Sequence, residues 1–408
     1  MVYLDAAATA PLRPQARAEM LRIWDAGGAN PSSVHAAGQW AARELAAARA
    51  SIAAAFGVRP DGVVFTSGGT EANNLGIIGR ALADPRGRRV VTTRIEHSSV
   101  LASCEHLARV HGFAVDYLPV DADGRVRADA RPPHDATLLA LGLANAEVGS
   151  VGDVAKLADA APCHIDAVQA AANLPVSLAP GGWPGPGAAS MAIASHKFGG
   201  PQGVGALLLP RDVPLEPLIH GGNQEGGRRA GTPDLAGIVG FAAAVRACAA
   251  EVGTRAVELM RSRDALVAAI EGGVPGARLT GHRTERLPNH ASFVVEGVSG
   301  EALLVALDAA GYAVSSGSAC RAGQSGPSPV LLEMGYDPEL AQSALRFTLP
   351  APLADADIAR IVEVLRAGAL AGRPHAPAGR PHAPAGRPHA PAGRPQRQNG
   401  VKTRPETR

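Results

Sequence analysis

The feature that most constrains the fold is an alternation of short apolar runs with helical stretches between residues 62 and 210. The apolar runs are predicted strands: GVVFT, RRVVTT, FAVDYLPV, TLLALGLAN, PCHID, SMAIAS and GVGALLLP. Predicted helices such as SSVLASCEHLARVHG and VAKLADAA (154–161) separate them. Short apolar strands that alternate with helices form a mostly parallel sheet covered on both faces. The predicted fold class is therefore α/β.

The rest of the chain divides into a larger and a smaller predicted domain. An Ala-rich helical region at 13–57 precedes the strand series, and a long helical stretch at 234–272 follows it. Beyond that stretch, the segments ASFVVEGV, EALLVALDAAG, YAVSSGSAC and LRFTLP indicate a smaller α+β unit. We predict a large domain over 13–252 and a small domain made of 1–12 and 253–370.

The segment 371–408 is predicted to be a disordered tail outside both domains. The heptapeptide AGRPHAP occurs there three times and begins a fourth time. Proline at this density prevents helix formation and strand pairing. The tail is basic, with eight arginine or lysine residues and one acid. Its His375, His382 and His389 could bind a metal, but their seven-residue spacing in a flexible chain does not preform a site.

Composition and cysteine spacing exclude several other classes of protein. With 46% apolar and 19% charged residues, the chain can bury a large core. The four cysteines form no C-x-x-C pair, which argues against a zinc site or a disulfide framework. We find no secretory signal and no uncharged apolar run of about 18 residues. We therefore expect a cytoplasmic protein without a membrane span, and its few aromatic residues argue against direct nucleic-acid binding.

Three predicted strand ends carry residues with a chemical use. Gly68 and Gly69 let backbone N–H groups approach an anion, and Thr70 adds a hydroxyl at a helix start. Asp166 lies in the apolar run HIDAVQAA, where a buried carboxylate needs a partner such as a pyridinium nitrogen. Lys197 in SHKFGG is suited to Schiff-base formation. Each feature alone also fits a plain structural role: an N-capped turn, a helix-capping acid and a surface lysine.

The three features together are more specific than any one of them. They fall in chain order at strand ends, which is where open α/β sheets bind ligands. A phosphate cup, a pyridinium acid and a Schiff-base lysine match pyridoxal 5′-phosphate, which has a phosphate, a ring nitrogen and a reactive carbonyl. We therefore predict this cofactor.

From residue 2 to about residue 370 the sequence resembles the cysteine desulfurases of the NifS/IscS-like group. These are class V aminotransferases with the fold-type I architecture of pyridoxal-phosphate enzymes. The matching motifs are VYLDAAATAP (2–11), NPSSVH (30–35), FTSGGTEANN (65–74), EHSSV (96–100), NAEVG (145–149), IDAVQ (165–169), SHK (195–197), GGNQEGGRRAGT (221–232), SSGSAC (315–320) and LRFTL (345–349).

The resemblance implies a cofactor-binding set in this chain. Lys197 would hold the cofactor covalently, and His97 would stack on its ring and take part in proton transfer. The other implied cofactor-binding residues are Gly69, Thr70, Asn145, Asp166, Gln169, Ser195, His196 and Thr232. Asp166 would contact the ring nitrogen and Gln169 the ring hydroxyl. Thr232 would reach the phosphate of the neighbouring subunit, which implies a homodimer.

The resemblance also implies how the substrate L-cysteine is held and cleaved. Asn145 and Arg346 would bind its carboxylate, for which a guanidinium offers a two-pronged fork. Cys320, in a Gly/Ser/Pro-rich stretch that suits a mobile loop, would take the sulfur as a persulfide and leave L-alanine. Cys320 is also a candidate ligand for a transient iron–sulfur cluster.

The expected function is therefore cysteine desulfuration, with sulfur delivered to an acceptor protein. That acceptor would be an iron–sulfur scaffold or a thiolating enzyme for tRNA or DNA. Another pyridoxal-phosphate reaction on the same fold, such as a selenocysteine lyase, a C–S lyase or a transaminase, stays open. A sulfur-relay scaffold without catalysis is the non-enzymatic alternative, and the intact set of Lys197, Asp166 and Cys320 argues against it.

Overall fold

The computed structural model describes residues 1–158, 160–210, 212–316 and 326–371. These residues belong to one compact unit, Met1–Arg373. The predicted tail lies outside them, except for Ala371, which is the last residue of a helix. The predicted domain boundary near residue 252 falls within one continuous helix, and the division into a large and a small domain stays a prediction.

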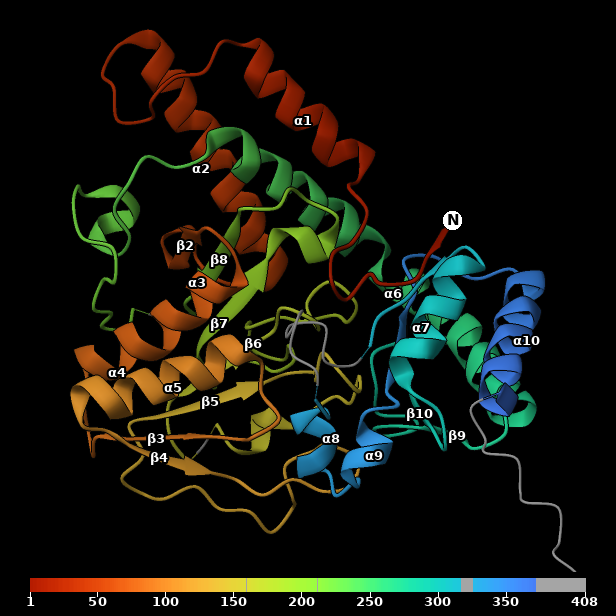
Figure 1. The fold of residues 1–408 in the computed structure, drawn as a ribbon. Coiled ribbons are helices and arrows are strands. Elements are labelled where there is room, and N and C mark those ends of the chain that lie inside the picture. The colour runs from red at the N-terminus through yellow and green to blue at the C-terminus, as the bar shows by residue number, and fades with distance from the viewer. Residues whose placement is uncertain (159, 211, 317–325, 372–408) are drawn as a thin grey trace, which may run out of the picture. The chain divides into compact units, whose positions relative to one another are not determined.

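A seven-stranded sheet forms the centre of this unit (Figure 1). Its strands are β2 (Val63–Thr66), β3 (Arg89–Thr92), β4 (Ala114–Tyr117), β5 (Leu138–Gly142), β6 (Cys163–Asp166), β7 (Ala188–Ala194) and β8 (Gly205–Leu208). The spatial order is β2-β8-β7-β6-β5-β3-β4, and only β8 runs against the others. The predicted mostly parallel sheet of seven strands is confirmed.

Helices cover both faces of this sheet, because successive strand residues point to opposite sides. On one face, Leu139 and Leu141 belong to a core shared with α2 (Ala36–Phe56) and α6 (Leu235–Gly273). On the other, Leu138 packs with residues of α5 (Ser98–His111). Three further segments complete the layers: α1 (Pro14–Asp25), which packs on α6, and the successive helices α3 (Gly69–Asn74) and α4 (Arg80–Ala83), which a π-helical turn joins.

The helix α6 is long and apolar enough to cross a membrane by length and composition alone. However, 67% of its most apolar stretch is buried inside the unit. Burial of this kind is what a core helix of a globular protein shows.

A second, antiparallel sheet lies beyond α6 in the chain. Its order is β12-β10-β9, from β9 (Ala277–Leu279), β10 (His290–Val295) and β12 (Leu345–Thr348). The helices of this part are α7 (Gly300–Ala309), α8 (Pro329–Glu333), α9 (Pro338–Ala341) and α10 (Asp355–Ala371). The chain's first strand, β1 (Val2–Tyr3), pairs in parallel with β11 (Tyr312–Ala313), so the N-terminal segment joins this part.

The helix predicted over 154–161 is wrong in length. The structure has a single 3₁₀ turn there, Val154–Lys156. Asp153, at the N-cap position, makes no capping hydrogen bond with its side chain. Pro162 disfavours helical backbone at the preceding residue, Ala161. A helix this short gains too few hydrogen bonds to offset its nucleation cost.

Phe241 tests the core that fixes α6 on the sheet. Its side chain is fully buried, and its ring lies 5.9 Å from that of Phe198. We expect Phe241→Ala to lower the free energy of unfolding by about 3–5 kcal/mol, because it removes a buried ring and leaves a cavity. The measurement is urea unfolding followed by circular dichroism. Val257→Ala on the exposed side of the same helix is the control and should cost under about 0.5 kcal/mol; equal losses would contradict this account.

Candidate active site

A cavity of about 460 Å³ lies at the carboxyl ends of the parallel strands. Nine of the predicted site residues line it: Gly69, Thr70, His97, Asn145, Asp166, Gln169, His196, Lys197 and Arg346. All except Arg346, which lies in the second sheet, follow strands of the central sheet, since α3 begins after β2, α5 after β3, and the Lys197 turn after β7. Parallel strands end at one edge of the sheet, which explains how residues so far apart in sequence converge.

The Asp166 carboxylate is held by a chain of hydrogen bonds that runs back into the sheet. Its Oδ1 accepts the Val168 N–H at 3.0 Å, and its Oδ2 accepts the Asn73 amide at 2.7 Å. The Asn73 carbonyl oxygen lies 3.0 Å from His164 Nε2, and His164 Nδ1 lies 2.8 Å from the Ser190 hydroxyl. Burial lowers the pKa of His164 to about 3. The ring is therefore neutral, donates to Asn73 and fixes the direction in which the carboxylate points.

Lys197 extends toward the N-terminal segment. Its Nζ donates to the carbonyl oxygens of Ala7 and of Ala8, the latter at 3.0 Å. The neighbouring His196 contacts the Thr9 hydroxyl at 3.2 Å. Burial, together with the charge of Lys197, lowers the pKa of His196 to about 4. His196 is therefore neutral near pH 7, which avoids a second cation beside the amine.

His97 is the N-cap of α5, and this position fixes its tautomer. Its Nδ1 accepts the Ser99 backbone N–H at 3.2 Å and lies 2.7 Å from the Ser99 hydroxyl. A backbone N–H can only donate, so the proton of the neutral ring lies on Nε2.

Arg346, in β12 of the second sheet, and Asn145, in the loop after β5, both line the cavity and already have protein partners. Arg346 pairs with Asp5 at 2.8 Å and donates to the Ala146 carbonyl at 3.1 Å, while its buried Nε has no partner among the described residues. The Asn145 amide donates to Ile95 O at 2.8 Å, and its oxygen accepts the Glu147 N–H at 2.8 Å. Asn145 therefore joins the loop after β3 to the loop after β5.

Glu96 contributes a half-buried carboxyl to the wall of the cavity. Burial raises its pKa to about 7, against hydrogen bonds from Thr93 and Gly142 that stabilise the charged form, and the charge of Asp166 raises it further. Both of those hydrogen bonds are 2.8 Å long. The Glu96 carboxyl therefore joins the end of β3 to the end of β5. Since Glu96 directly precedes His97 in the sequence, this link also fixes the backbone next to His97.

Three predicted site residues do not line this cavity. Ser195 is buried, its hydroxyl has no partner among the described residues, and a Cβ added to Gly200 would lie 2.3 Å from that hydroxyl. Thr232 lines a different, smaller pocket with Arg229. Cys320 lies outside the described residues, as do the three tail histidines. Within the described part of the chain, no group of three or more His, Cys, Asp or Glu side chains could hold a metal ion.

Several residues that position the site were not predicted from the sequence. They are Asp5, Asn73, Glu96 and Ser99, together with the carbonyls of Ala7 and Ala8. Ser99 contacts His97, which is two residues away. Each of the others forms a hydrogen bond or ion pair with a residue remote in sequence. All of them lie inside quoted motifs, which was the available signal: Asp5, Ala7 and Ala8 in VYLDAAATAP, Asn73 in FTSGGTEANN, and Glu96 and Ser99 in EHSSV.

The chain matches the sequence profile of the family described as Aminotransferase class-V over residues 2–360. It is 41% identical over 386 residues to an IscS-like cysteine desulfurase of Mycobacterium tuberculosis (strain ATCC 25618 / H37Rv), which covers 91% of this chain and 96% of the relative.

Solved structures resemble the fold. A NifS-like protein superposes with a TM-score of 0.80 at 31% identity, covering 90% of this chain and 98% of the other. A structure described as SspA in complex with cysteine gives a TM-score of 0.73 at 28% identity, covering 87% and 100% of the two chains.

The raised pKa of Glu96 predicts a specific pH dependence of stability. In the unfolded chain the carboxyl loses its proton near its usual value of 4.5, and in the folded chain near 7. The folded chain therefore binds more protons between these values, so the free energy of unfolding falls as pH rises from 4.5 to 7. Glu96→Gln should remove a decrease of about 3 kcal/mol between pH 4.5 and 8.

The measurement is urea unfolding of wild type and Glu96→Gln at several pH values. Asp337→Asn, at the cap of α9, is the control that should leave the profile of the wild type in this range nearly unchanged. Parallel pH profiles for wild type and Glu96→Gln would contradict the assignment of this titration to Glu96.

Proposed function

The chain belongs to the class V aminotransferase family, among its cysteine desulfurases of the IscS and NifS type, and we propose that it converts L-cysteine to L-alanine and passes the sulfur to its own Cys320. The observation that carries this proposal is the convergence of Lys197, Asp166, His97 and Arg346 on one cavity at the strand ends. An amine, a fixed carboxylate, an imidazole and a guanidinium are the groups that amino-acid chemistry on a pyridine cofactor needs.

We propose pyridoxal 5′-phosphate as the cofactor, and the residues of the cavity fit it. Asp166 presents a carboxylate held by two donors, which suits a protonated ring nitrogen. Gly69 lies so close to Val168 that an added Cβ would be 2.6 Å from Val168 Cγ2, so a larger residue would fill the cradle at the start of α3. When bound, this cofactor supplies an aldehyde that condenses with amines and an electron sink that acidifies the substrate Cα–H.

The chain's own residues would bind and orient the substrate. The Arg346 Nε–H, buried and without a described partner, offers a donor to the carboxylate of L-cysteine. The ion pair with Asp5 holds the guanidinium in place before substrate arrives. Asn145 keeps a second amide hydrogen beyond the one given to Ile95, and this hydrogen can serve the same carboxylate.

Lys197 would move the proton at Cα. In its neutral form His97 carries its proton on Nε2, so it acts there as a donor and leaves the role of base to the Lys197 amine. Gln169, whose amide donates to Ala7 O at 3.0 Å, lies on the same wall as this lysine and would face the ring hydroxyl.

The described cysteines support Cys320 as the nucleophile by being unsuited to that role themselves. Cys104, Cys163 and Cys248 are buried, and burial raises the pKa of the Cys104 and Cys163 thiols to about 12. Thiols of this kind stay protonated near pH 8 and attack poorly. In the proposed step a Cys320 thiolate attacks the substrate sulfur, the carbon–sulfur bond breaks with its electron pair leaving on carbon, and protonation of that carbon gives L-alanine.

The assembly and the next sulfur acceptor are part of the same proposal. We propose a cytoplasmic homodimer in which Thr232 contributes to the phosphate site of the partner subunit. A persulfide on Cys320 would pass its sulfur to an acceptor protein, either an iron–sulfur scaffold or a thiolating enzyme, and Cys320 would be the residue that ligates a cluster transiently.

Covalent attachment of the cofactor can be tested because the chain has only three lysines, at 156, 197 and 402. Borohydride reduction of the loaded protein should add the pyridoxyl mass to the Lys197 peptide alone, read by mass spectrometry. Lys197→Ala should lose that label and the visible absorbance, whereas Lys156→Ala should keep both. Label on another peptide, or none on the wild type, would refute the assignment.

The role of Cys320 can be tested by product analysis with L-cysteine and a thiol reductant. We expect the wild type to release alanine and sulfide, and loaded Cys320→Ser to keep the cofactor absorbance but lose both products by about 100-fold or more, because no nucleophile then reaches the sulfur. Cys248→Ala is the matched control and should stay near the wild-type rate. Undiminished sulfide release by Cys320→Ser would favour a C–S lyase.

A further inference from the structure

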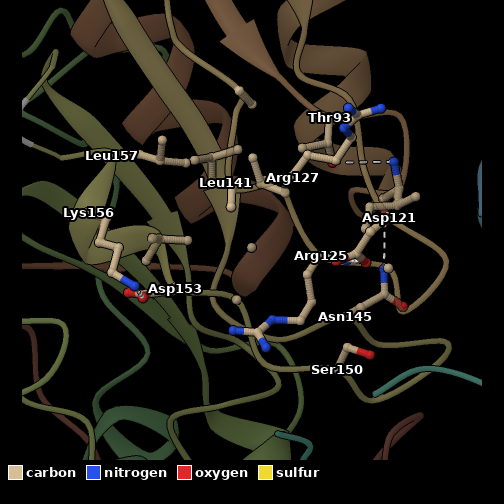
Figure 2. A pocket seen from close by; sticks show the side chains of 18 of the residues that line it. Thr93, Asp121, Arg125, Arg127, Leu141, Asn145, Ser150, Asp153, Lys156 and Leu157 are labelled. Atoms are coloured by element: carbon tan, nitrogen blue, oxygen red, sulfur yellow. Dashed lines mark hydrogen bonds and ion pairs between the residues drawn. The ribbon is translucent and has the colours of Figure 1, made fainter.

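A second cavity, of about 490 Å³, lies beside the first (Figure 2). The two share a wall made of Ile95, Glu96, Gly142 and Asn145. The floor of the second cavity is apolar, with Val126, Ala130, Leu141, Val154 and Leu157 as its lining side chains. None of the residues to which we assign direct contact with cofactor or substrate lies in it, Asn145 excepted.

Four cationic side chains line this second cavity, and three of them are already engaged. Lys156 pairs with Asp153, and Arg127 pairs with Asp129 at 2.8 Å. Arg131 donates to two backbone carbonyls, at 2.9 and 2.8 Å. All three therefore have hydrogen-bond partners in the protein without a ligand, and two of them, Lys156 and Arg127, are paired with acids.

Arg125 is the exception. Its side chain is half-buried and extends across the cavity, between Lys156 and Asp153 on one side and Asn145 and Ser150 on the other (Figure 2). No hydrogen bond or ion pair joins its guanidinium to any residue that the structure describes.

The three acids that line this cavity are committed to other donors, and Asp153 among them pairs with Lys156. Asp121 accepts the backbone N–H of Arg125 itself and that of Asp123, both at 3.0 Å. The Glu96 carboxyl is bonded to Thr93 and Gly142. The cavity therefore combines an apolar floor with one uncompensated guanidinium.

We propose that this second cavity binds a small monocarboxylate with an apolar body, and that Arg125 holds its carboxylate. A guanidinium binds one carboxylate through two parallel hydrogen bonds, which makes a single unpaired arginine sufficient. The apolar body would lie on the Leu141 and Val154 side of the cavity and remove that surface from water. A dianion such as phosphate fits less well, because Lys156 and Arg127 are paired with acids and Arg131 already donates to two carbonyls.

The shared wall places such a ligand next to groups that shape the active site. Asn145 joins the two loops that carry His97 and Glu147. A ligand in the second cavity would contact Asn145 on the side away from the active-site cavity. This inference goes beyond cysteine desulfuration and holds or fails independently of it.

The test uses 4-fluorobenzoate as the probe and the full-length protein loaded with pyridoxal phosphate. Binding is followed by broadening of the probe's ¹⁹F NMR line. We expect a millimolar or tighter dissociation constant for the wild type and a loss of affinity of about tenfold or more for Arg125→Gln. Arg127→Gln is the matched control, since Arg127 lines the same cavity but is paired with Asp129, and it should change the affinity by less than about twofold.

A second variant tests the cavity without changing charge. Gly152 lines it, and an added Cβ there would meet no atom closer than 3.4 Å, so Gly152→Leu should fold and fill the space. We expect this variant to lose probe binding. Excess L-alanine should not displace the probe from the wild type. Displacement by L-alanine, equal losses in the two arginine variants, or no binding at about 10 mM probe would each overturn the proposal.

Discussion

The rest of the active site depends on one half-buried carboxylate at the end of a central strand. Asp166 is costly to keep charged at the sheet edge unless donors compensate it, and the chain supplies them from α3 and from its own backbone. From Asp166 the hydrogen bonds continue into the sheet, from Asn73 to His164 and from His164 to Ser190. Because every member of this chain of hydrogen bonds has a partner, the carboxylate has one orientation, and α3 is locked to β6 in the process.

The second sheet fixes the opposite wall. The Ala146 carbonyl accepts from both Arg346 and His290, and Arg286 donates to the Val148 carbonyl at 3.0 Å. Burial lowers the pKa of Arg286 to about 9, with the charge of Arg263 adding to the effect. The loop after β5 is thus held by two arginines, from β12 and from the segment before β10, and by the His290 ring of β10. Through these bonds the substrate side of the site follows the second sheet, whereas the cofactor side follows the first.

Sequence patterns predicted the sheet and the strand-end residues because these depend on local periodicity and on where parallel strands must end. Gly69, Asp166 and Lys197 could be identified in that way. The positioning partners could not, since Asn73 looks like any polar helix residue until Asp166, 93 positions away, is brought to it. The short 3₁₀ turn at 154–156 shows the opposite failure: Ala-rich composition favours a helix, but a following proline and the absence of a cap decide the outcome.

The position of the first ten residues has a consequence for biosynthesis. Ala7 and Ala8 hold the Lys197 amine, Asp5 pairs with Arg346, and the Ala7 N–H donates to the Thr348 hydroxyl across 341 positions of sequence. During translation Asp5 and the Ala7 N–H must therefore wait for the last described strand, β12, before they acquire their partners. The central sheet can assemble while the ribosome is still working, but the catalytic chamber closes only near the end of synthesis. A nascent chain released early would have a folded core without a finished reaction site.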